Sequence, residues 1–150
     1  MKSNFILLFL TFIMIACSSE KKENQAFKKM KFSIYPPALP PDQMCITEIF
    51  EIEGNTLKYT KSEGLCGGTT PKDKSQTVTL TQEKRQEIRS ILVKLKADKF
   101  SKDSKYDGNA SANLNIQWGD KEESFSFLHY EGEEITKLHT TLRAMIKEAK

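Results

Sequence analysis

The sequence contains few of the residues from which metal sites and catalytic sites are usually built. It has two histidines, which we place on a strand edge (His129) and on the flank of the last helix (His139). Neither an H-x-x-x-H nor a C-x-x-C spacing occurs, so we expect no metal site. The nucleophile motif G-x-S-x-G and the glycine motifs that cradle phosphate groups are also absent. These absences weigh against an enzyme, although carboxylates are plentiful.

The excess of positive charge is also small. Lysine and arginine number 23, aspartate and glutamate number 20, and the formal net charge is +3. Domains that bind nucleic acid usually carry a strong basic excess, so the composition argues against a nucleic acid partner. A chain of 150 residues is about one domain long.

What the sequence does contain is an apolar segment near its start that ends at a cysteine. Residues 5–15 are apolar but for one threonine, Lys2 precedes them, and Ala16 and Cys17 follow. A positive start, an apolar core and a small residue before the cut are the three parts of a secretory signal. The run is shorter than the ~20 residues that a membrane-spanning helix needs. An abrupt polar segment begins at Ser18.

This layout resembles the lipobox of bacterial lipoproteins, in which the cysteine becomes the lipidated first residue of the mature protein. The resemblance implies cleavage after residue 16 and a diacylglycerol on the sulfur of Cys17, and we expect no cofactor besides this covalent lipid. Met14 departs from the pattern, which usually has leucine there. An ordinary secretory signal and an uncleaved anchor are the alternatives. Ser18 favours the outer membrane over the inner membrane, and leaves periplasmic or surface exposure open.

Three segments are therefore expected along the chain. Residues 1–16 form the cleaved signal, residues 17–31 a lipidated tether, and residues 32–150 a single folded domain. The tether is polar and rich in lysine, a composition that favours disorder. Within the domain, residues 32–35 can form a first strand, and the four prolines of residues 36–41 predict a stiff surface loop.

The clearest local prediction is a hairpin over residues 45–61, which turns at Gly54 and Asn55. If Glu53 lies opposite Thr56, four facing pairs are each apolar with apolar or opposite in charge, as cross-strand stabilisation favours. A slip of one residue would break all of these pairs. The predicted pairs are Ile52 with Leu57, Phe50 with Tyr59, Glu48 with Lys61, and Glu51 with Lys58.

Two cysteines remain once Cys17 is assigned to lipid, namely Cys45 and Cys66. An even pair in an oxidising compartment favours a disulfide, which would stabilise the fold by about 3 kcal/mol. The hairpin register puts Cys45 opposite Gly64, two residues before Cys66, so the bond would hold the open end of the hairpin. A metal pair and a reactive thiol are the competing interpretations.

Further elements follow towards the C-terminus. Residues 76–80 read as a strand, Thr81 is placed to cap the helix that follows, and residues 111–118 and 124–127 predict a second hairpin. A final helix begins near Glu133. The apolar stripes of the two helices are Ile88, Ile91, Leu92 and Leu95 in the first, and Ile135, Leu138, Leu142, Met145 and Ile146 in the second.

The expected fold class is α+β, with element order ββ-β-α-ββ-α. Two hairpins and one further strand give an antiparallel sheet of about five strands, with two helices packed on one face. The layout resembles a group of small, uncharacterised bacterial envelope domains in Cys45 before the first strand, Gly54 at the turn, Tyr59 on the return strand, the helix led by Thr81, and Tyr106. The more usual cysteine-rich entry to the first strand is reduced here to Cys45. The resemblance supports the fold and implies no activity.

The favoured functional hypothesis is a membrane-anchored envelope lipoprotein that acts as a binding or accessory module without catalysis. Its expected partners are membrane lipid, through Cys17, and an envelope protein, a cell-wall component or a host factor. Tyr35, Tyr106 and the proline-rich loop are the expected contact surface, because aromatic side chains are enriched at interfaces. The alternative is a small periplasmic hydrolase or thiol redox enzyme that uses Cys66 or His129.

Overall fold

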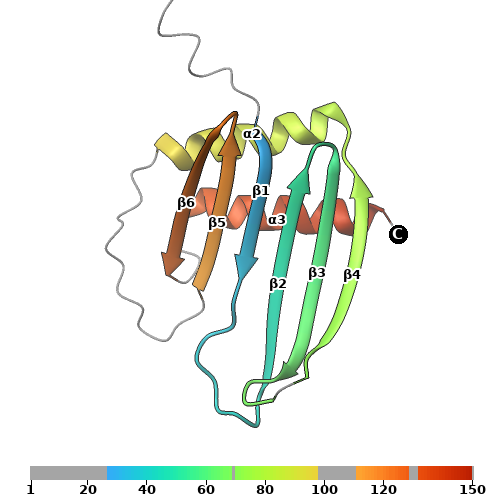
Figure 1. Cartoon of the computed structure of the whole chain (residues 1–150), viewed down its shortest axis with the longest axis vertical. Helices are drawn as coiled ribbons and strands as arrows, with labels where there is room; N and C mark the ends of the chain where they lie inside the picture. The colour runs from blue at the N-terminus through green and yellow to red at the C-terminus, as the bar shows by residue number, and fades with distance from the viewer. Residues whose placement is uncertain (1–26, 69, 98–110, 129–131, 150) are drawn as a thin grey trace, which may run out of the picture.

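An antiparallel sheet with two helices on one of its faces makes up the structure, a computed structural model that describes residues 27–68, 70–97, 111–128 and 132–149 (Figure 1). The strands are β1 (Phe27–Ile34), β2 (Met44–Glu53), β3 (Thr56–Leu65), β4 (Lys72–Thr79), β5 (Ser111–Trp118) and β6 (Lys121–Leu128), and the helices are α2 (Gln82–Ala97) and α3 (Glu133–Glu148). The strand order in the sheet is β4-β3-β2-β1-β5-β6. The predicted α+β class is confirmed, but the described sheet has six strands instead of about five.

The additional strand is β1, which includes most of the possible first strand over residues 32–35 and lies between β2 and β5 in the middle of the sheet. We expected a tether over residues 17–31 and a domain that begins at residue 32, whereas the strand already begins at Phe27. Phe27 and Met30 are each 2 % exposed. A shift of register between Phe27 and Lys29 turns both side chains to the buried face although they are three residues apart. This irregularity breaks the alternation that normally reveals a strand, so the segment read as a polar tether.

The first hairpin has the predicted register. Glu53 lies opposite Thr56, and the four predicted pairs and the placing of Cys45 opposite Gly64 are all present. Gly54 in the turn has a positive φ of 56°, which glycine adopts without steric cost. The register predicted from the side-chain pairs is therefore confirmed.

The core lies between the sheet and the two helices. Each helix buries the apolar stripe that its spacing predicts, and the sheet contributes alternate residues of its strands, among them Phe32, Phe50 and Leu114. The hydroxyl of Thr81 accepts a hydrogen bond from the backbone N–H of Lys84 at 3.3 Å, so the predicted cap is confirmed. Figure 1 shows both helices crossing behind the sheet, and no helix of the described residues covers its other face.

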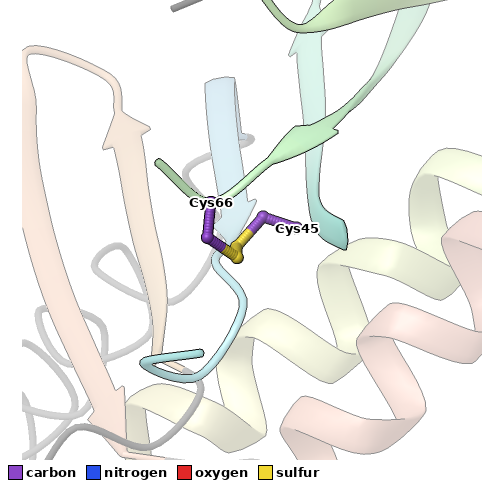
Figure 2. Close-up of a disulfide and its surroundings, with 2 residues drawn as sticks. All are labelled: Cys45 and Cys66. Atoms are coloured by element: carbon purple, nitrogen blue, oxygen red, sulfur yellow. A yellow bond between two sulfur atoms is a disulfide. The ribbon is translucent and has the colours of Figure 1, made fainter. Parts of the chain in front are cut away.

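A disulfide between Cys45 and Cys66 joins the open end of the hairpin, as predicted (Figure 2). Their Cα atoms are 5.0 Å apart, inside the range that such a bond needs. Two backbone hydrogen bonds hold the same end, from Cys66 to the carbonyl of Gln43 at 2.9 Å and from Gly67 to that of Pro41 at 3.1 Å. A Cβ on Gly67 would approach that of Pro41 to 2.7 Å, so this contact requires glycine.

Candidate functional site

The carboxylate of Glu48 is held on the buried face of the sheet. The residue is 4 % exposed and lies in line with Phe50 and Ile52 on β2. A buried charge is costly unless other groups pair with it and hydrogen-bond to it. The surroundings of Glu48 therefore decide whether this residue is a reactive group or a structural one.

Three side chains from two elements surround this carboxylate. Tyr59 on β3 donates its hydroxyl to Oε1 of Glu48 at 2.6 Å. From α3, Arg143 donates Nε to Oε1 at 3.1 Å and a second guanidinium nitrogen to Oε2. His139, also on α3, has its Nε2 3.1 Å from Oε2 and its ring edge-on to Phe32 and Phe50. We call these four residues, Glu48, Tyr59, His139 and Arg143, the Glu48 cluster.

The cluster shifts two pKa values away from neutrality. Burial by itself would raise the pKa of the Glu48 carboxyl, but the hydrogen bonds from His139, Arg143 and Tyr59 outweigh it and lower the pKa from 4.5 to about 2. Burial, and then the hydrogen bond to Glu48, raise the pKa of the Tyr59 hydroxyl. Glu48 is therefore an ionised acceptor near neutral pH, which requires Nε2 of His139 to carry a proton.

These shifts favour a structural role for the Glu48 cluster. A general acid or base works best with a pKa near the operating pH, and both shifted groups have moved away from it. The carboxylate instead connects α3 to strands β2 and β3. A cavity beside it, lined also by Lys61 and Lys147, has a volume of about 200 Å³. That is smaller than the ~300–1,000 Å³ of most ligand pockets.

The larger hollow lies on the other face of the sheet. It is a groove of about 680 Å³ that spans strands β6, β5, β1, β2 and β3, near the turns at Gly54 and Gly119. Met30, Ile52 and Ile116 contribute main chain to its floor, because their side chains are buried on the helix side. Its volume is within the range of ligand pockets. We call it the open-face groove.

Polar side chains from these five strands line the open-face groove. The charged ones are Lys29, Lys31, Glu51, Glu53, Lys58 and Glu122. The uncharged ones are Thr56, Asn115 and Gln117. Lys29 pairs with Glu53, and Lys31 pairs with Glu51 at 3.2 Å. The groove therefore offers charges of both signs together with amide and hydroxyl groups.

The structure places only some of the residues singled out in the sequence. Cys45 and Cys66 form the predicted disulfide. Tyr35 follows the end of β1 and is 38 % exposed. Three other predicted residues lie outside the described residues. They are Cys17, the expected lipidation site; Tyr106, which was expected to share a contact surface with Tyr35; and His129, the histidine of the enzyme alternative.

Two features were missed by sequence reasoning. The predicted hairpin register already put Glu48 on the same face as Phe50 and Ile52, so a charge on the buried face could have been noticed. Its partner His139, however, is 91 residues away in sequence. The open-face groove left no comparable signal, because it depends on β1 lying beside both β2 and β5.

The described residues offer neither a metal site nor a membrane-spanning helix. The described residues contain no group of three or more His, Cys, Asp or Glu placed to hold a metal ion. No helix within the described ranges is long and apolar enough to cross a membrane. Comparison with models of known protein families found no match, and comparison with curated protein sequences found none either.

Proposed function

We propose that this chain is a lipid-anchored envelope protein whose folded domain binds a ligand, without catalysis, on the uncovered face of its sheet. The observation that carries the proposal is the open-face groove. It combines a rigid main-chain floor with a polar lining drawn from five strands. Ligand sites commonly combine a preformed concave shape with a few polar groups that fix the orientation of the ligand.

Two features support the anchored location. The residues around Cys17 have the order of a lipoprotein signal, and two or three acyl chains would hold the protein on a membrane far more firmly than one. The Cys45–Cys66 disulfide fits an oxidising compartment such as the envelope. Both features favour a location outside the cytoplasm, beyond the inner membrane.

The thiol part of the enzyme alternative has less support. The thiolate is the reactive form of cysteine, and the sulfur of Cys66 is bonded to that of Cys45. A resting nucleophile at this position therefore does not fit the structure. Binding at the open-face groove needs no reactive group.

Photo-crosslinking tests whether the uncovered face is the binding face. Thr77 and Ser124 are exposed and lie in the ladder beside the groove residues Lys58 and Asn115, one on each side of the groove. A photoreactive amino acid at either position should crosslink the same component in whole cells, detected as one shifted band on a gel.

Matched controls come from the solvent-exposed sides of the helices. Gln86 on α2 and Lys137 on α3 are exposed and lie on the helix side of the sheet. The same photoreactive residue there should give no such band. Equal bands from all four positions, or none from Thr77 and Ser124, would contradict the proposal.

The anchor is tested separately by replacing Cys17. Cys17→Ser removes the sulfur that carries the diacylglycerol, so the protein should move from the membrane fraction to the soluble fraction. Ser18→Ala keeps the cysteine and should remain with the membrane. Fractionation followed by immunoblotting measures both, and a Cys17→Ser protein that stays on the membrane would show that another segment anchors it.

A further inference from the structure

We propose that the open-face groove binds an extended peptide segment that carries both carboxylate and ammonium groups. This inference rests on the proposed function above and names the chemical class of the ligand. It follows from the arrangement of charges, from their spacing along the strands, and from the side chains that the groove lacks.

The charges of the groove form stripes that run along the strands. Crossing the sheet from β6, the first stripe is the acid Glu122, and the amides of β5 follow. The lysines of β1, the glutamates of β2 and Lys58 of β3 come next. Three lysines and three glutamates leave no formal net charge in the lining. A ligand of one sign would meet repulsion as well as attraction there, whereas one with both signs can match the stripes.

The spacing within the stripes suits an extended chain. Lys29 and Lys31 are two residues apart on one strand, and so are Glu51 and Glu53 on the next. At ~3.3 Å per residue, the like charges in each stripe repeat about every 6.6 Å. Side chains on each side of an extended peptide repeat at the same distance. A peptide lying along the strands between two neighbouring stripes can therefore present carboxylates to the lysines of β1 from one side and ammonium groups to the glutamates of β2 from the other.

The charged residues of the groove can exchange their present ion-pair partners for charged groups of a ligand. The side chains of Lys31 and Glu51 are 49 % and 40 % exposed, and those of Lys29 and Glu53 are more exposed still. Ion pairs this close to water contribute only about 0–1 kcal/mol. Little free energy is therefore lost when a ligand carboxylate replaces a glutamate beside a lysine, or a ligand ammonium replaces a lysine beside a glutamate.

The remaining lining also favours a peptide. Asn115 and Gln117 provide amide donors and acceptors that suit the main chain of a peptide. No aromatic side chain is found among the described residues that line the groove. A ligand that binds through its apolar surface, or a sugar ring that stacks on an aromatic face, has no suitable partner here.

A titration of the full chain in detergent micelles with synthetic peptides tests the inference. The probe is a capped heptapeptide in which two glutamates and two lysines alternate at four successive positions, flanked by serine, so that like charges are two residues apart and the two signs project from opposite sides of the extended chain. The comparison peptides replace these four residues with four glutamates, four lysines or four serines. Isothermal titration calorimetry should show at least tenfold tighter binding of the mixed peptide. Equal binding of a single-sign peptide, tighter binding of an N-acetylglucosamine tetramer, or no binding of the mixed peptide would overturn the inference.

Variants locate the binding. Lys31→Ser and Glu51→Ser should each weaken binding of the mixed peptide by about threefold to fivefold, and raising the salt concentration should weaken it further. Lys28→Ser is the matched control, because Lys28 pairs with Asp120 and is not part of the groove lining. An equal loss in all three variants would place the peptide elsewhere. If Thr77 and Ser124 still crosslink a component while no peptide binds, the peptide class is wrong and the proposed function stands.

Discussion

Replacing Glu48 by glutamine should lower the free energy of unfolding by about 3 kcal/mol, the lower end of what breaking a buried ion pair costs. Glutamine keeps the size of the side chain, so no cavity is created. The change removes the charge that Arg143 and His139 pair with and puts an amide donor among three donors. The loss stays at the lower end because the side chain of Arg143 is 50 % exposed and regains water.

The matched control is Glu51→Gln on the other face of the same strand. Glu51 pairs with Lys31 in a setting where both side chains are 40 % exposed or more. Its replacement should cost less than about 1 kcal/mol. Urea unfolding followed by the fluorescence of Trp118 measures both variants, and equal small losses would show that the Glu48 cluster contributes no more than a surface pair.

The same carboxylate predicts how stability depends on pH. Because the pKa of Glu48 is lower in the folded protein, about 2 against 4.5, its contribution is complete above pH 4.5 and is lost as the pH falls to about 2. The shift corresponds to about 3 kcal/mol. The difference in stability between the parent protein and Glu48→Gln should therefore shrink over this range. A difference that stays constant from pH 6 to pH 2 would contradict the assigned ionisation.

How much the sequence revealed depended on how local each feature is. The hairpin register could be predicted because every pair in it lies within a short stretch of chain, and one slip would have mismatched them all. The helix stripes were equally local. The start of strand β1 was misjudged because the irregularity after Phe27 hides its alternation, and because its lysines point to solvent and pair with residues of other strands, such as Glu51 and Glu53.

The candidate sites required knowledge that no local pattern contains. The Glu48 cluster joins β2 and β3 to a helix more than ninety residues away in sequence, as the contact between Glu48 and His139 shows. The open-face groove brings Lys31 of β1 beside Glu51 of β2 and Asn115 of β5. Packing of the whole sheet determines which strands from distant parts of the chain lie side by side. Charges on the solvated face of the sheet carry no periodic signal that distinguishes a ligand site from an ordinary soluble surface.

Removal of the Cys45–Cys66 disulfide should lower the free energy of unfolding by about 3 kcal/mol and the melting temperature by roughly 10 °C. The bond closes a loop between residues 21 apart, and its loss mainly gives the unfolded chain more freedom. The folded chain keeps the hairpin ladder and the backbone hydrogen bonds of Cys66 and Gly67 at the same end. Scanning calorimetry of a Cys45→Ala, Cys66→Ala double variant measures the change.

Reduction of the parent protein provides the control. A reductant should lower the melting temperature of the parent to that of the double variant and leave the variant itself unchanged. Identical melting of the oxidised parent and the variant would show that the bond contributes no stability. Peptide affinity should be unaffected, because Glu53 and Thr56 place the open-face groove beside the hairpin turn, at the opposite end of the ladder from the disulfide. The disulfide would then stabilise the fold while the other end of the same hairpin takes part in binding.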